Sequence, residues 1–146
     1  MYLAIWMDGI WNMHYYDLIL GYDLSVYPSY YEPWGYTPLE SIAFHVPTVT
    51  TDLAGFGLWV NSLKGRFSEL ADGVKVIHRT DYNYSEVADV IKDTVSDFSA
   101  LSAAEIKKIR KNAAAIAEKA LWKHFIQYYY EAYDIALRNA EKRLAL

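Results

Sequence analysis

The feature that most constrains the fold is a strand, a proline- and glycine-rich loop and a helix start between residues 24 and 43. The segment Leu24-Ser25-Val26-Tyr27 is predicted as a buried strand, and Pro28 ends it because proline cannot donate a hydrogen bond to a neighbouring strand. Thr37 and Pro38 are typical of a helix start, with threonine as N-cap and proline at the first helical position. The loop therefore joins the carboxyl end of a strand to the amino end of a helix.

This arrangement suits a nucleotide-sugar ligand. A helix N-terminus offers unpaired N–H groups and about half a positive charge, so it can receive a phosphate without a lysine. In an open α/β sheet, ligands bind at the carboxyl ends of the strands. Glu32 and Glu40, separated by seven residues, could accept hydrogen bonds from sugar and ribose hydroxyls, and Gly35 lets the backbone come close. The alternative is that both glutamates are ordinary solvated charges near a helix end.

The flanking segments extend the same pattern into a parallel sheet. The helix ends at His45-Val46-Pro47, the β-branched run 48–51 is predicted as the next strand, and 74–77 is the last clear strand. Residues 52–57 are expected to form a loop whose glycines allow close approach to a ligand or to neighbouring backbone, and 64–73 a polar connection with a possible helical turn. Residues 2–6 could be a first strand, followed by a helix that Asn12 caps and that runs to about Leu20.

From Asn83 onward the sequence is helical. Asn83 with Glu86, and Ser102 with Glu105, have the spacing of capping boxes. Three apolar stripes at helical spacing follow: 87, 90, 91, 95 and 98; then 106, 109, 113, 116 and 120; then 121, 125, 129, 132 and 136. We predict a partial Rossmann-like domain over residues 1–82, with helices on both faces of its sheet, and a C-terminal helical segment over 83–146 that packs on it.

Composition limits the classes of function. The 146 residues fit one domain, and a net charge of −4 argues against nucleic-acid binding, which needs a basic face. There is no cysteine, no basic signal-peptide region and no apolar run of eighteen residues, so we expect a cytoplasmic protein without membrane contact. The chain has 14 Tyr and 5 Trp, a surplus expected to cover surfaces that contact missing partners or a second copy of the chain, as in a homo-oligomer.

Other candidate sites are weaker. The four histidines, at 14, 45, 78 and 124, are scattered, so no metal site is predicted. Gly55-Phe56-Gly57 lacks the third glycine and the following helix of a dinucleotide-binding fingerprint, which leaves a loop. The basic run formed by residues 107, 108, 110 and 111 is interpreted as a solvated helix face. The run Tyr128-Tyr129-Tyr130 is interpreted as packing rather than a sugar platform, because consecutive residues point around a helix.

The run from Tyr27 to Gly57, which begins YPSYYEPWGYTPLE, closely resembles the C-terminal domain of animal and fungal glycogen synthases. The resemblance continues more weakly into Tyr15–Leu24 and into the tail, at Trp122-Lys123, Tyr128-Tyr129 and Ala136-Leu137. Such enzymes have two Rossmann-like domains with the active site between them, the GT-B fold. The resemblance therefore implies that this chain is part of one such pair.

The resemblance also implies roles for individual residues. Glu32 matches the active-site carboxylate that contacts the donor glucose, and Glu40 matches the carboxylate that holds the ribose. The backbone of Trp34, Gly35 and Tyr36 matches the sugar-contacting turn, with Tyr36 and Thr37 at the phosphate. Tyr15 matches the aromatic residue on which the base stacks; core packing of Tyr15, or a one-residue slip to Tyr16, is the alternative. The basic run matches poorly the arginine cluster that senses a sugar phosphate in eukaryotic members, so no such regulation is expected.

What the resemblance implies is transfer of glucose from a nucleotide donor to the non-reducing end of an α-1,4-glucan with retention, without a protein metal or cofactor. UDP-glucose is the favoured donor and ADP-glucose the alternative. The arginine and lysine that bind the diphosphate lie upstream of the matched region, and so does the N-terminal domain. We therefore expect weak nucleotide binding and negligible transfer by the isolated chain. The competing hypothesis is a non-catalytic module that binds nucleotide, glucan or a protein partner.

Overall fold

The computed structural model describes residues 10–144, so the strand predicted at residues 2–6 lies outside the described residues. Three strands alternate with helices in the first half of this range, and three long helices follow. In chain order the elements are α1 (Tyr15–Ile19), β1 (Ser25–Val26), α2 (Tyr36–Ala43), β2 (Thr48–Thr51), α3 (Gly55–Lys64), the 3-10 turn η1 (Leu70–Asp72), β3 (Val74–Ile77), α4 (Tyr84–Ser99), α5 (Ala103–Lys119) and α6 (Trp122–Leu144).

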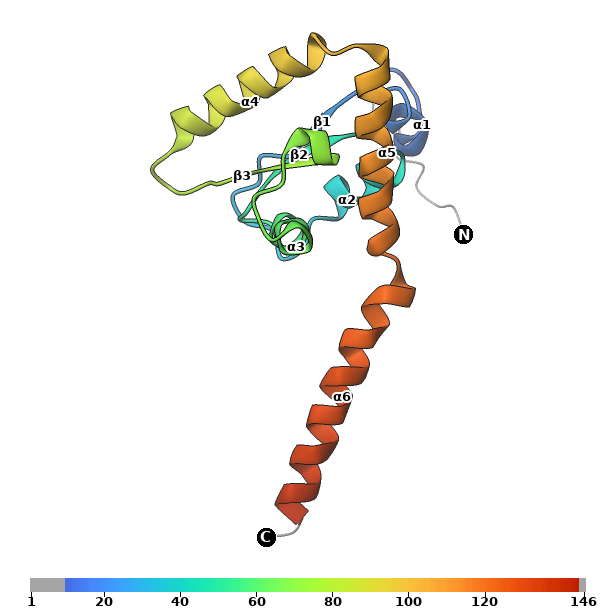
Figure 1. Cartoon of the computed structure of the whole chain (residues 1–146), viewed down its shortest axis with the longest axis vertical. Coiled ribbons are helices and arrows are strands. Elements are labelled where there is room, and N and C mark those ends of the chain that lie inside the picture. Colours follow the sequence, from blue (N-terminus) through green and yellow to red (C-terminus); the bar gives the residue numbers. More distant parts are fainter. Residues whose placement is uncertain (1–9, 145–146) are drawn as a thin grey trace.

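The three strands form one parallel sheet in the order β1-β2-β3 (Figure 1). Ser25 pairs with Thr48, and Thr48 in turn pairs with Val74, so the strands are aligned near their starts. The helices α2 and α3 are the crossover connections between successive strands, as a parallel sheet requires. The predicted α/β class with a partial Rossmann-like sheet is confirmed.

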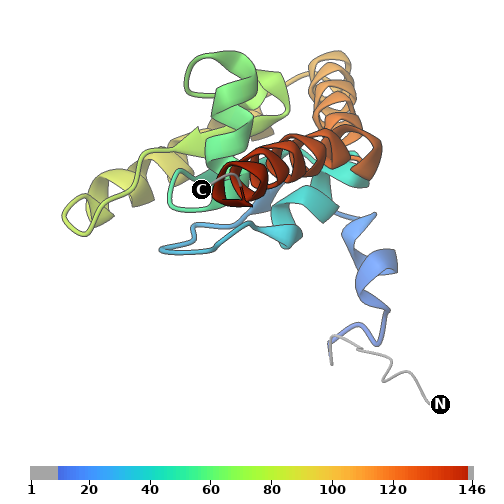
Figure 2. The same cartoon turned by 90° about the horizontal axis from the view of Figure 1, so that it is seen from below.

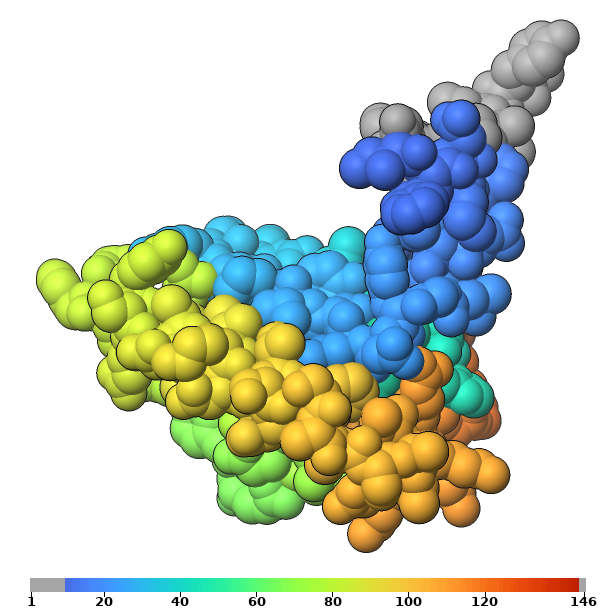
Figure 3. Space-filling view, turned by 90° about the horizontal axis from the view of Figure 1, so that it is seen from above, coloured from blue at the N-terminus to red at the C-terminus, as the bar shows by residue number. Residues whose placement is uncertain are grey.

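Helices cover both faces of the sheet, also as predicted. On one face, Ile42 of α2, Phe56 of α3, Val76 of β3 and Ala113 of α5 belong to one buried cluster. On the other face, α4 contributes Val87, which packs on strand residues together with partly buried Val90 and Ile91. The central strand β2, all four of whose residues are buried, is covered from two sides, which accounts for its continuous β-branched sequence. The helices α1 and α4 lie at opposite sides of the molecule (Figures 2 and 3).

The segment predicted as a glycine loop at 52–57 is instead the start of a helix, since α3 begins at Gly55. A Cβ atom on Gly55 would lie 2.2 Å from the Pro33 carbonyl oxygen, and one on Gly57 would lie 2.2 Å from that of Thr51. These glycines therefore allow a helix to approach two backbone segments, rather than giving a loop its freedom. The expectation that no helix follows Gly55-Phe56-Gly57 was wrong for this reason.

Two predicted helix starts also need correction. The first helix begins at Tyr15, with His14 rather than Asn12 as N-cap, and it ends at Ile19. The helix α4 begins after Asn83 as predicted, but the Asn83 side chain does not cap it. That side chain accepts from the Thr80 amide (2.8 Å) and donates to the His78 carbonyl (3.0 Å), so it closes the preceding turn instead.

The C-terminal helices differ in how much they pack. Ser102 and Glu105 form the predicted capping box of α5, which buries Ile109, Ala113 and Ile116. The helix α6, in contrast, buries no residue and extends away from the sheet (Figure 1). Its predicted apolar stripe is mostly exposed, and so are all three residues of the run Tyr128-Tyr129-Tyr130. The proposed division at residues 82 and 83 stays a prediction.

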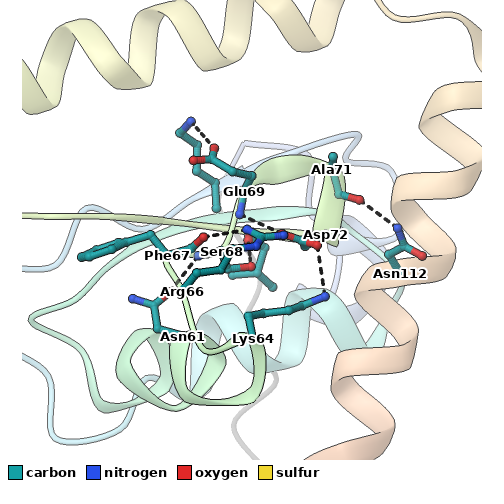
Figure 4. A network of polar contacts seen from close by, with 11 residues as sticks. Asn61, Lys64, Arg66, Phe67, Ser68, Glu69, Ala71, Asp72 and Asn112 are labelled. Carbon is teal, nitrogen blue, oxygen red and sulfur yellow. Dashed lines mark hydrogen bonds and ion pairs between the residues drawn. The ribbon is translucent and has the colours of Figure 1, made fainter.

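A polar network fixes the connection between α3 and β3 (Figure 4). Asp72 accepts from Lys64 (3.1 Å) and Arg66 (2.8 Å), and its carboxylate also caps η1 by accepting from the Glu69 amide (3.1 Å). Burial opposes ionisation of Asp72, but these hydrogen bonds outweigh it and lower its pKa below the ordinary value. Asn112 of α5 donates to the Ala71 carbonyl (2.8 Å), which ties the tail to the same turn.

Candidate functional site

The loop of residues 29–35, here called the Glu32 loop, is held by backbone hydrogen bonds at the carboxyl end of β2. The Glu32 amide donates to Leu53 (3.3 Å), and the Gly55 amide donates back to the Glu32 carbonyl (3.1 Å), so residue 32 pairs in parallel with Ala54. One step further, the Phe56 amide donates to Trp34 (2.6 Å). The loop thus extends the sheet beyond its last regular pair, and its backbone is fixed rather than free.

The Glu32 side chain lies beside the amino end of α2. Its Oε2 atom would be 3.6 Å from a Cβ atom on Gly35, and it accepts a long hydrogen bond from the Ser29 hydroxyl (3.4 Å). The side chain is neither buried nor fully exposed. A carboxylate held in this way can still accept hydrogen bonds from the hydroxyls of a ligand.

The start of α2 differs from the prediction by two residues. Gly35, not Thr37, is the N-cap, with φ of 110°, and the helix begins at Tyr36. This conformation suits glycine, and Pro38 is tolerated at the third helical position because first-turn amides have no partner within the helix. No side chain caps this end. The amides of Tyr36 and Thr37, two exposed residues, are therefore available to an anion.

Glu40 lies near the two candidate tyrosines of α1. The Tyr16 hydroxyl donates to Glu40 Oε1 (3.4 Å), and the Tyr16 ring packs against Phe44 with centroids 5.5 Å apart. Burial, together with the neighbouring Tyr27 and Glu40, raises the pKa of the Tyr15 hydroxyl well above its ordinary value. The structure thus brings Tyr15, Tyr16 and Glu40 together beside the C-terminal half of α2.

The Trp34 side chain belongs to an aromatic cluster. Its ring is 5.8 Å from Trp59 and 5.5 Å from Phe125, measured between centroids. With the start of α6 these rings border a groove of about 600 Å³. The groove is lined by Trp34, Tyr36, Leu39, Trp59, Ala120, Trp122, Phe125, Tyr128 and Tyr129. The backbone of Trp34 is thus part of the Glu32 loop, and its side chain lines this aromatic groove.

The sequence model of the family described as glycogen synthase matches residues 5–143. The chain belongs to the glycogen synthase family. The glycogen [starch] synthase of Neurospora crassa is 30% identical over 128 residues, which cover 88% of this chain and 18% of that protein. Glycogen [starch] synthase isoform 2 of Saccharomyces cerevisiae is 30% identical over 132 residues, 90% of this chain and 19% of its own.

The liver glycogen [starch] synthase of Mus musculus gives a similar match, 30% identity over 128 residues, covering 88% of this chain and 18% of the mouse protein. The resemblance found in the sequence is thereby confirmed. The chain spans about a fifth of the length of these glycogen synthases, so it corresponds to one portion of such an enzyme.

Three residues next to the Glu32 loop were not predicted to contribute to the site. Asp52 follows β2, and His78 and Arg79 follow β3, so all three stand at the carboxyl ends of parallel strands. Asp52 accepts from the His78 ring (2.5 Å) and from the Arg79 amide (2.9 Å). Their position directly after predicted strands was a signal for this edge. His78 was instead counted among scattered histidines, because its partner Asp52 is 26 residues away in the sequence.

The pairing of His78 with Asp52 makes one contribution to stability depend on pH. The hydrogen bond to Asp52, and then the Asp52 charge, raise the pKa of His78 above 6.5. A raised pKa in the folded state stabilises the fold fully below pH 6.5, and this stabilisation is lost as pH rises through the folded-state value. We expect His78→Gln to lower the urea midpoint of unfolding more at about pH 6 than at about pH 9.

The control for this prediction is the same substitution in an Asp52→Asn chain. Asparagine can still accept from the Arg79 amide but carries no charge. In that background the effect of His78→Gln should change much less with pH, because only the weaker influence of the Glu86 charge still raises the pKa of His78. An equal pH dependence in both backgrounds would contradict the assignment to this pair.

Within residues 10–144, no helix is long and apolar enough to cross a membrane. The same part of the chain contains no group of three or more His, Cys, Asp or Glu side chains arranged to hold a metal ion. The predicted absence of a protein metal stays a prediction.

Proposed function

We propose that this chain is the donor-sugar portion of a glycogen synthase that transfers glucose from UDP-glucose to the non-reducing end of an α-1,4-glucan with retention. The observation that carries the proposal is the position of the Glu32 carboxylate beside Gly35 and the uncapped amino end of α2. One short segment thereby offers an acceptor for sugar hydroxyls and amide donors for a phosphate.

In this proposal Glu32 binds the glucose hydroxyls and steadies the sugar as positive charge develops at its anomeric carbon. The amides of Tyr36 and Thr37 face the phosphate. Glu40 holds the ribose, with Tyr15 beside it for the base. The departing diphosphate helps to deprotonate the acceptor, so catalysis depends on positioning and charge stabilisation, without a protein cofactor or metal.

The glucan acceptor needs groups from the N-terminal domain. The diphosphate needs the arginine and lysine that lie upstream of the matched region in the family. We therefore propose weak nucleotide binding and negligible glucosyl transfer by the chain alone, in a cytoplasmic enzyme. UDP-glucose is preferred to ADP-glucose.

A calorimetric titration of the chain with UDP-glucose, ADP-glucose and a maltooligosaccharide tests the proposal. We expect UDP-glucose to bind most tightly, and Glu32→Gln or Glu40→Gln to weaken it by about tenfold, the effect of losing a hydrogen bond to a charged group. A matched control is Glu131→Gln, on the exposed part of α6. Absence of UDP-glucose binding, or binding that neither Glu32→Gln nor Glu40→Gln weakens, would contradict the donor-site proposal.

The aromatic groove supports a second candidate, a glucan-binding module without catalysis. Trp122 and Tyr129 have ring centroids 5.1 Å apart at its edge and are 57% and 48% exposed. Exposed aromatic rings offer apolar faces on which a sugar can pack. Maltooligosaccharide binding that Trp122→Ala weakens and Glu32→Gln does not would favour this function over the first.

A further inference from the structure

A buried arginine without an acidic partner lies at the base of the Glu32 loop. Arg79 is only 6% exposed, although arginine is among the residues least often buried. Among the described residues, no carboxylate forms an ion pair with its guanidinium, and its Nε atom has no hydrogen-bond partner. Burying a charge without an opposite charge is costly, so the contacts that Arg79 does make must account for its position.

Those contacts all reach the segment that enters the Glu32 loop. Nη1 of Arg79 donates to the Pro28 carbonyl, and its guanidinium lies over the Tyr30 ring, 3.7 Å from the centroid. From β2, the Thr51 hydroxyl donates to the Ser29 carbonyl (2.7 Å). Residues 28, 29 and 30 are thus held one after another by side chains at the carboxyl edge of the sheet.

Arg79 is itself held in place from the same edge. Its amide donates to Asp52 Oδ1 (2.9 Å), and the other Asp52 oxygen accepts from His78. A planar guanidinium can donate to a carbonyl and stack on a ring at the same time, which a lysine ammonium cannot do. The pair of contacts at Pro28 and Tyr30 therefore calls for arginine.

From this geometry we propose that Arg79 is a positioning residue, which fixes the entry of the Glu32 loop and so places the Glu32 carboxylate for the donor sugar. The assignment of the sugar to Glu32 rests on the proposed function; the fixing of the loop does not. Arg79 is not proposed to touch the ligand.

Hydrogen exchange of individual backbone amides tests the fixing of the loop without any ligand. We expect Arg79→Met to accelerate exchange of the Glu32, Gly55 and Phe56 amides by about tenfold, the effect of losing one hydrogen bond from a charged donor. The Val76 amide, which donates to Ser68 (2.9 Å) in the core, should be unchanged. Arg79→Lys should give an intermediate rate.

The matched control is Arg66→Met, because Arg66 is an exposed arginine whose ion pair with Asp72 lies on the α3–β3 connection. This variant should leave exchange at Glu32, Gly55 and Phe56 unchanged. Unchanged exchange in Arg79→Met, or acceleration as large at Val76 as at Glu32, would overturn the proposal, since the second result is a general loss of stability.

Comparing UDP-glucose with UDP then tests the consequence for the sugar. If Arg79 positions Glu32, Arg79→Met should reduce the ratio of UDP-glucose to UDP affinity as Glu32→Gln does, while UDP affinity itself changes less than twofold. An unchanged ratio alongside accelerated loop exchange would overturn the role of Arg79 in sugar placement. A wild-type chain that binds neither nucleotide would contradict the proposed function, and the exchange result would still decide whether Arg79 fixes the loop.

Discussion

Gly73→Ala should destabilise the fold by about 2–6 kcal/mol, from two penalties of about 1–3 kcal/mol each. Gly73 has φ of 103°, a conformation that side chains other than glycine rarely adopt. A Cβ atom there would also lie 2.2 Å from the Ala113 amide nitrogen, so the backbone of α5 would have to move away. Urea unfolding followed by circular dichroism measures this loss.

The matched control is Gly65→Ala. Gly65 also has a positive φ, of 65°, but a Cβ atom there would meet no atom within 4 Å. It should therefore cost only about 1–2 kcal/mol, the strain alone. Equal losses of unfolding free energy in the two variants would contradict the close packing of the α5 backbone against Gly73.

Gly55→Ala should disrupt the Glu32 loop more than any substitution of a surface side chain. A Cβ atom at Gly55 would lie 2.2 Å from the Pro33 carbonyl oxygen and 3.3 Å from the Trp34 Cα atom. Because α3 is anchored in the core through Phe56, the loop rather than the helix should move. We expect a destabilisation of about 1–3 kcal/mol and at least about a tenfold loss of UDP-glucose affinity.

The control for Gly55→Ala is Leu58→Ala on the same helix, since Leu58 is 57% exposed. That variant should retain UDP-glucose affinity and most of the stability. Calorimetry and urea unfolding on both variants make the comparison. Full UDP-glucose affinity in Gly55→Ala would contradict the close contact between α3 and the Glu32 loop.

The sheet could be predicted from the sequence because each strand is marked by a local signal. Pro28 and Pro47 bound two of the segments, and β-branched residues fill the strand from Thr48 to Thr51. The capping box at Ser102 was equally local, and it is present in the structure. Signals of this kind depend only on neighbouring residues in the sequence, so they can be recognised without knowledge of tertiary contacts.

The start of α3 could not be predicted, because it depends on contacts between distant segments. Gly55 and Gly57 suggest a loop when only neighbouring residues are considered. In the structure, the absence of a side chain lets Gly55 lie against the backbone of Pro33 and Gly57 against that of Thr51. The shift of the α2 start to Tyr36 has a similar cause, since a Cβ atom at Gly35 would lie 3.2 Å from the Pro38 side chain and 3.3 Å from that of Phe56. Tertiary contacts outweighed local preference in both places.

The arrangement of the candidate site residues could be predicted only in part, for the same reasons, and their roles stay predictions. Glu32 and Glu40 stood out through the resemblance to glycogen synthases, and the structure places Glu32 beside Gly35 and Glu40 beside Tyr16. The interaction of Arg79 with Pro28 joins residues 51 positions apart, and nothing in the sequence near either residue indicates it.

The most direct test of the donor-sugar proposal is a map of amide chemical shifts in the ¹⁵N-labelled chain during titration with UDP-glucose and with UDP. We predict shifts at the amides of Gly35, Tyr36 and Thr37 with both ligands, and a further shift at Glu32 with UDP-glucose alone. Glu32→Gln should remove this difference between the ligands at residue 32. Shifts confined to the aromatic groove around Trp122, Phe125 and Tyr129, or no shifts at Glu32 and at residues 34–37, would contradict the donor-sugar proposal.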